Sequence, residues 1–319
     1  MSGNFTRMPE LWFDDGSIIL NVQSHLFRVH RAVLALHCAF FRDMASLAQP
    51  DSLEMYEGLP LLTLRDDHPQ DMTHFLKAVY FPHYLDPPPS KTSFEVIEGV
   101  LRLAHKYDAP SLRRCALEHL ADAFTTDINL LGSSQIMATY ARTPEGAFAG
   151  GELQAATALA RETHALWLLP GIFYHTLQFP LDHYVSQNVW LSRARRYSVE
   201  DTAICLAGCT KLRQEYPFDM LFDEEIGCEE EECMLARMRL FTPSDISKFP
   251  ESPLTYHADQ DWMVYDNGLA VVCDECKEEM RRKLYQWRHD VWERFPGYFN
   301  LPNWNELLQT KKSDLGYVV

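Results

Sequence analysis

Strand-like sequence is confined to the first 64 residues of this 319-residue chain, and that asymmetry limits what the chain can fold into. Residues 18–22 (IILNV) and 26–29 (LFRV) are rich in β-branched and aromatic side chains and flank a short polar segment, which is typical of a β-hairpin. Residues 61–64 (LLTL) form a further short strand candidate. Beyond them, apolar residues recur at helical spacing. Strands followed by helices indicate an α+β domain rather than alternating β and α elements.

Helical periodicity dominates the remainder of the chain. We expect helices at residues 33–44, 69–80, 93–107, 111–124, 129–142, 152–169, 198–215, 229–241 and 273–295. Segments that contain proline or glycine separate the later helices, at residues 144–151, 170–171, 249–253 and 296–297. At roughly 150 residues per domain, the length favours two domains. We assign residues 10–125 to an α+β domain, 127–305 to a mostly α-helical C-terminal domain and 306–319 to a polar tail.

The charge balance argues against several kinds of partner. The sequence has 29 Lys and Arg against 45 Asp and Glu, a formal net charge of −16, which would repel a nucleic-acid backbone. The longest apolar stretch, residues 165–173, contains a proline and a glycine and is far shorter than the about 20 residues of a membrane span. The first ten residues lack the apolar core of a signal peptide. We therefore expect an intracellular protein, cytoplasmic or nuclear, that binds neither nucleic acid nor membrane.

A series of motifs in the first 125 residues stands in the order of a known family. The motifs are residues 13–20 (FDDGSIIL), 26–34 (LFRVHRAVL), 40–44 (FFRDM), 101–107 (LRLAHKY) and 112–116 (LRRCA). In this order they resemble the BTB/POZ domain, in which a strand hairpin leads through an F-x-V-H-R-x-x-L junction into a pair of helices. Residues 10–125 also have the length of one such domain. The resemblance implies protein–protein contact and no enzymatic activity.

The resemblance extends into the second half of the chain. Residues 167–174 (WLLPGIFY), 281–284 (RRKL) and 292–304 (WERFPGYFNLPNW) are similar to segments of a large group of mushroom-type fungal (basidiomycete) BTB proteins. In that group a mostly helical C-terminal half follows the BTB domain. The resemblance therefore covers nearly the whole chain.

The resemblance implies two functions. BTB domains homodimerise or serve as scaffolds, and some act as substrate adaptors for cullin-type ubiquitin ligases. Residues 80–89 (YFPHYLDPPP) lack the Thr-Gly turn of animal members and a clear hydrophobic-x-Glu motif for cullin contact. We therefore expect homodimerisation or scaffolding, with this protein itself and further proteins as partners. The alternative is an adaptor that holds a cullin through residues 66–84 and the helices after residue 126.

In the family, the dimer surface involves the N-terminal strand and the first helices, which correspond here to residues 11–44. We select four apolar positions there as interface candidates: Trp12, Phe13, Leu34 and Phe41. These side chains can equally fill the core of the domain itself. Asp15 and His30 stand at the family's junction between hairpin and helix, where the aspartate helps to line a charged pocket on the dimer side. The alternative for His30 is that it caps or packs against the start of the first helix.

The eight cysteines include two close pairs, Cys228 with Cys233 and Cys273 with Cys276, separated by about forty residues. Two such pairs can converge on a tetrahedral Zn²⁺ ion, because zinc favours thiolate ligands and a C-x2-C spacing brings two of them together. The alternative is that all four are reduced cysteines packed as small apolar side chains. Thioredoxin-like chemistry is disfavoured, because the two acids between Cys273 and Cys276 oppose a reactive thiolate. Structural zinc is the one cofactor that the sequence indicates.

Motifs for catalysis are absent from the sequence. It contains no nucleophile elbow, phosphate-binding loop, dinucleotide-binding glycine motif or H-E-x-x-H zinc motif. An enzyme would need a site without a motif in the helical half, formed by converging acids and histidines. Cys205 and Cys209 lie four residues apart on an expected helix and fit core packing. The aromatic residues between positions 287 and 304 fit a packed helix face, with a peptide-binding groove as the alternative.

Overall fold

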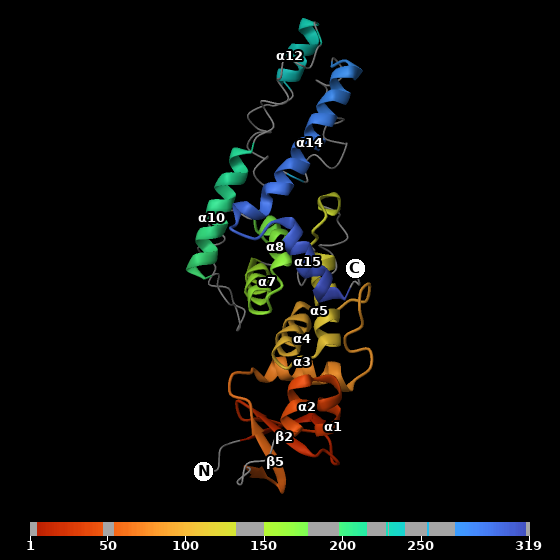
Figure 1. Cartoon of the computed structure of the whole chain (residues 1–319), viewed down its shortest axis with the longest axis vertical. Helices are drawn as coiled ribbons and strands as arrows, with labels where there is room; N and C mark the ends of the chain where they lie inside the picture. The colour runs from red at the N-terminus through yellow and green to blue at the C-terminus, as the bar shows by residue number, and fades with distance from the viewer. Residues whose placement is uncertain are drawn as a thin grey trace. The chain divides into compact units, whose positions relative to one another are not determined.

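The computed structural model describes residues 5–46, 54–131, 150–177, 198–215, 228, 230–239, 254 and 272–316. The chain divides into two compact units. The first comprises Met1–Ala123, Arg161–His164 and Lys312–Val319, and the second comprises Phe124–Ala160 and Ala165–Lys311. All described strands lie in the first unit, whereas the described part of the second is helical (Figure 1). The prediction of an α+β domain followed by a helical region is thereby confirmed.

The strands of the first unit form one sheet. They are β1 (Thr6–Trp12), β2 (Ile18–Val22), β3 (His25–Val29), β4 (Met55–Tyr56) and β5 (Leu59–Thr63), in the order β1-β3-β2-β5-β4. The antiparallel pair β2 and β3 is the predicted hairpin. Its turn residues Gln23 and Ser24 have φ angles of 46° and 67°, the positive values that a tight two-residue hairpin turn requires. The strands β1 and β5 extend the sheet in parallel to β3 and β2.

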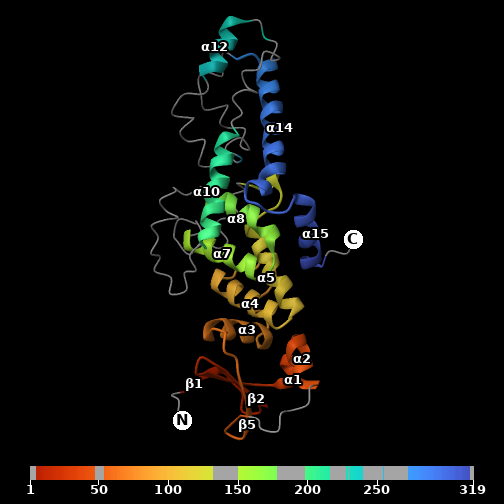
Figure 2. The same ribbon diagram turned by 60° about the vertical axis from the view of Figure 1, so that its left-hand side comes forward.

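Helices cover the sheet and enclose the core of the first unit (Figure 2). They are α1 (Arg31–His37), α2 (Ala39–Ser46), α3 (Pro69–Tyr80), α4 (Phe94–Lys106) and α5 (Pro110–Ala123). Two of them begin at capped residues: the His68 side chain accepts the Gln70 N–H, and the Ser93 hydroxyl accepts the Val96 N–H. The core that the helices share with the strands includes Leu20, Val22, Phe27, Phe75 and Tyr107.

One buried ionic network lies inside the first unit. The guanidinium of Arg102 donates to Asp71 at 2.9 Å, to Glu98 at 2.6 Å and to Glu162 at 3.0 Å. Burial by itself lowers the pKa of Arg102. The hydrogen bond and charge of Glu98, aided by Asp71 and Glu162, outweigh that effect and hold the pKa above its ordinary value. The network satisfies the rule that buried charges are paired.

The second unit is built from helices around aromatic side chains. Its elements are η1 (Ile128–Leu130), α7 (Gly150–Glu162), η2 (Leu166–Leu168), α8 (Leu169–Thr176), α10 (Val199–Gln214), α12 (Glu231–Arg239), α14 (Asp274–Tyr298) and α15 (Trp304–Leu315), with the last residues of α7 and α15 assigned to the first unit. The rings of Phe173 and Phe299 stack with centroids 4.9 Å apart. Trp287, Trp292, Phe295 and Trp304 are buried as well, as the packing interpretation of this aromatic segment predicts.

Several helix ends differ from those expected. The helix expected at 152–169 ends at Glu162, because His164 adopts a φ of 58° that no α-helix continues through. The break expected at Pro170 is wrong, since this proline lies in the first turn of α8, where its missing N–H costs nothing. The break expected at 296–297 lies inside α14, which ends at Tyr298.

Other expected segments lie outside the described residues or belong to a different element than expected. Residues 132–142 of the expected helix at 129–142, and the breaks at 144–149 and 249–253, lie outside the described residues. Residues 306–315 of the expected polar tail belong to α15, which begins at Trp304. The indole N–H of this tryptophan donates to the carbonyl of Trp292 at 2.6 Å, so the start of α15 is tied to α14.

Candidate metal centre and interaction surface

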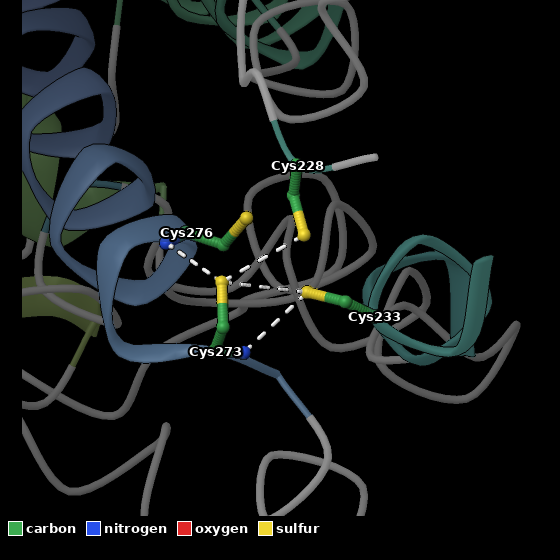
Figure 3. Close-up of side chains that lie close together, drawn as sticks. All are labelled: Cys228, Cys233, Cys273 and Cys276. Atoms are coloured by element: carbon green, nitrogen blue, oxygen red, sulfur yellow. Dashed lines mark hydrogen bonds between the residues drawn. The ribbon is translucent and has the colours of Figure 1, made fainter. Parts of the chain in front are cut away.

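The four paired cysteines converge at one point of the second unit (Figure 3). Their Sγ atoms all lie within 4.8 Å of one another. The Sγ of Cys273 is 3.8 Å from that of Cys228 and 3.8 Å from that of Cys233. A tetrahedron of sulfurs around zinc, with Zn–S bonds of about 2.3 Å, has edges of about 3.8 Å. The predicted convergence is confirmed, and the four sulfurs fit a tetrahedral ion such as Zn²⁺.

Local structure explains why the sulfurs point inward. Cys273 is the N-cap of α14, and its Sγ accepts the N–H of Cys276 at 3.5 Å. The N–H of Cys273 in turn donates to the Sγ of Cys233, on α12, at 3.4 Å. The N–H of Cys276 and its thiol lower the pKa of the Cys273 thiol below its ordinary value. Backbone donors and a helix N-terminus favour thiolates, the form in which cysteine binds metal.

Apolar side chains enclose the cysteine cluster. Cys233 and Cys276 are buried, while Cys228 and Cys273 are half-buried. The residues packed around them are Ala236, Val272, Met280 and Leu284. Burial raises the pKa of the Cys276 thiol, so the cluster needs a cation to hold all four sulfurs as thiolates. The separations of 3.8 Å are far longer than the about 2.05 Å of a disulfide bond.

The junction between hairpin and α1 brings Asp15 and His30 together. The His30 Nε2 lies 3.0 Å from the Asp15 Oδ1, and this hydrogen bond lowers the pKa of the exposed carboxyl group. The backbone N–H of His30 donates to the Tyr80 hydroxyl at 2.8 Å. Phe13 stacks on Tyr80 with ring centroids 4.7 Å apart. His30 occupies the N-cap position of α1, but its side chain makes no capping hydrogen bond. Its ring lies instead against the rings of Phe13 and Tyr80.

Comparison with known proteins identifies the first unit. A family model described as BTB/POZ domain matches residues 15–123. These residues are a BTB/POZ domain. The chain therefore carries a protein–protein interaction module, while a search of the curated proteins gave no match. The resemblance of the C-terminal half to mushroom-type fungal BTB proteins stays a prediction. In the described part of the chain, no helix has both the length and the apolar content to cross a membrane.

The four apolar candidates on the BTB domain have different surroundings. Leu34 and Phe41 are fully buried in the core of the domain, the second of the two roles that the sequence left open. Their burial agrees with the core role, and their part in an interface stays a prediction. Phe13 is half-buried in the junction described above. Trp12 is also half-buried, with the Arg7 guanidinium 4.7 Å from its ring centroid.

The first two helices expose two apolar side chains that are not among the residues predicted from the sequence. Leu36 on α1 has 79% of its surface exposed, and Phe40 on α2 has 45%. Helix register contains the signal for Leu36, since two positions after the buried Leu34 a side chain points to nearly the opposite face of α1. Singly exposed apolar residues are common on protein surfaces, and Leu36 and Phe40 stand out only because they lie on two consecutive helices.

Proposed function

We propose that this chain is a non-enzymatic interaction protein that self-associates through the α1–α2 surface of its BTB domain. The observation that carries the proposal is the exposure of Leu36 and Phe40 on two consecutive helices. Both residues fall within the segment 11–44, where the BTB resemblance places the dimer surface. In a two-fold dimer the same surface of both subunits is buried, so each side chain contributes once from each subunit.

The burial of these side chains sets the expected size of the effect. Complete burial of a leucine or phenylalanine side chain is worth about 1.5–3 kcal/mol. Large apolar and aromatic anchors carry most of the binding energy in protein interfaces. A charged residue at either position loses that contribution twice per dimer and must desolvate two like charges. The double variant Leu36→Asp/Phe40→Asp should therefore be monomeric.

Light scattering of the purified protein tests self-association. We expect a solution mass near twice 36.9 kDa for the wild-type chain and near 36.9 kDa for Leu36→Asp/Phe40→Asp. Val199→Asp is the matched control, because Val199 is an exposed apolar residue at the first position of α10, outside the BTB domain. A monomeric wild-type protein would refute the proposal. Co-purification of that monomer with a cullin would favour the alternative role as a ligase adaptor.

We further propose that Cys228, Cys233, Cys273 and Cys276 hold a structural Zn²⁺ ion. The supporting observation is that four sulfurs, from segments forty residues apart, lie within 4.8 Å of one another, with two of the separations at 3.8 Å. Four sulfurs in a tetrahedron suit zinc or iron, and a site closed by four protein ligands leaves no position for a substrate. The ion would join α12 to the start of α14.

Elemental analysis tests the metal. We expect about one zinc per chain in the wild-type protein and none in Cys273→Ser/Cys276→Ser. Cys205→Ser is the control, because Cys205 is a buried cysteine outside the cluster, and it should keep the metal. Iron with strong visible absorption would replace zinc in the proposal, and a metal-free wild-type protein isolated under reducing conditions would refute it.

A further inference from the structure

A buried arginine lies on the same helix as one of the four cysteines. Arg237 is on α12, has only 6% of its surface exposed, and follows Cys233 by one helical turn. Its Nε and Nη1 atoms are buried without a hydrogen-bond partner. Removing a guanidinium from water without pairing it is costly, so a buried arginine normally faces a negative charge.

The two faces of α12 place Arg237 on the cysteine side. The buried residues of this helix are Cys233, Ala236 and Arg237, whereas Met234 and Leu235 are exposed. Residues four apart on a helix are neighbours on one face, with Cβ atoms about 5–6 Å apart. The stem of Arg237 therefore leaves α12 from the same face as the Cys233 thiol.

The described carboxylates near this helix do not neutralise Arg237. Glu231 and Glu232 are exposed at the N-terminal end of α12, and Glu230 precedes them. On the facing start of α14, the Asp274 carboxylate pairs with Lys277 at 3.1 Å. Among the described residues, the source of negative charge that remains on the buried face of α12 is the group of four cysteine sulfurs.

Metal binding supplies that negative charge. When Zn²⁺ binds, four S–H groups release four protons to solvent and four Zn–S bonds form. The product, one divalent cation with four thiolates, carries two net negative charges. Arginine suits the role of counter-ion here, because its guanidinium is always charged and is more weakly hydrated than an ammonium group.

We propose that Arg237 is the counter-ion of the metal–thiolate centre and raises its affinity for zinc. This inference rests on the proposed zinc site. The sequence contains its signal as an arginine four residues after a ligand cysteine, although that spacing alone could not show burial.

Zinc affinity of the full-length chain tests the proposal, measured by competition with a chromogenic chelator at pH 7. Losing an outer-shell partner typically costs 10–100-fold in metal affinity, so we expect Arg237→Met to bind zinc at least 10-fold more weakly than wild type. Arg237→Lys keeps the positive charge, so it should lose less zinc affinity than Arg237→Met. Arg281→Met is the matched control, because Arg281 is a half-exposed arginine on α14 paired with Glu278 at 3.3 Å, and its loss should change the affinity less than 2-fold.

Thermal unfolding of the metal-free proteins separates a charge role from a packing role. Methionine fills a similar volume without a charge, so metal-free Arg237→Met should unfold at or above the wild-type temperature and gain less from added zinc. Equal zinc affinities for Arg237→Met and wild type would overturn the inference while leaving the zinc site intact. Equal destabilisation of the metal-free and zinc-bound variant would overturn it too, by making Arg237 a packing residue. A wild-type chain without zinc affinity would instead refute the zinc site itself.

Discussion

Replacement of Arg102 by methionine gives the sharpest test of how the BTB domain is held together. The side chains of Arg102 and Asp71 are only 10% and 4% exposed, so solvent screens their ion pair little. The variant leaves the carboxylates of Asp71 and Glu98 buried without their cationic partner. Removal of one member of a buried ion pair costs about 3–5 kcal/mol, whereas an exposed pair one turn apart on a helix is worth about 0.3–0.5 kcal/mol.

Amide hydrogen exchange on peptides from α3 and α4 measures this loss directly. At about 1.4 kcal/mol per factor of ten, a loss of about 3–5 kcal/mol accelerates exchange by roughly two to three and a half powers of ten. Arg114→Met is the matched control, since Arg114 is an exposed arginine that pairs with Glu118 at 3.5 Å on α5. If Arg102→Met accelerates exchange no more than Arg114→Met does, the buried network does not stabilise the domain and the reasoning is wrong.

The pH dependence of the same variant provides an internal check. Without Arg102, the native state gains stability when the two buried carboxylates bind protons, because protonation removes their uncompensated charge. The native state of the variant then binds more protons than its unfolded chain. The loss in free energy of unfolding caused by Arg102→Met should therefore shrink as the pH falls from 7 towards 5. A deficit that grows in this range would contradict the electrostatic explanation and favour lost packing of the arginine stem.

Three further predictions concern single contacts. Gly208→Ala should lower the unfolding temperature of the second unit, because the added Cβ would lie 2.2 Å from the Phe299 ring. Gly297→Ala should not, because nothing lies within 4 Å of its added Cβ, and differential scanning calorimetry compares the two variants. His30→Ala should raise the pKa of the Asp15 carboxyl group towards its ordinary value, which an NMR titration would show, and an unchanged titration would contradict the hydrogen bond. Removal of the metal with a chelator should accelerate hydrogen exchange in α12 and in the first turns of α14 but not in α4, and added zinc should reverse the change.

Local signals predicted the parts of the fold that depend on neighbouring residues. The hairpin of β2 and β3 follows from two β-rich segments around a short polar turn, and α3 begins where Pro69 and its neighbours predicted a helix start. No strand was predicted over residues 6–11 of β1, because this segment contains Pro9 and shows no regular alternation of apolar and polar residues. Its partner in the sheet is β3, and no local pattern indicates a pairing between distant segments.

The candidate sites show the same division between local and long-range information. Cys273 and Cys276 could be paired from their spacing, and their association with Cys228 and Cys233 could be inferred because metal chemistry supplies a long-range rule for thiolates. Apolar interface residues have no such rule. A large apolar side chain serves a core and an interface equally well.

Leu34 and Leu36 show what decides between core and interface. Both are leucines on the seven-residue helix α1, yet one is fully buried and the other is the most exposed of the large apolar residues described on the first two helices. Their difference lies in helix register relative to a sheet whose position depends on the whole domain. Residue type therefore limits the choice of interface candidates, and only the packed fold selects among them. Substitution of Leu36 rather than Leu34 consequently tests self-association without leaving a cavity in the core.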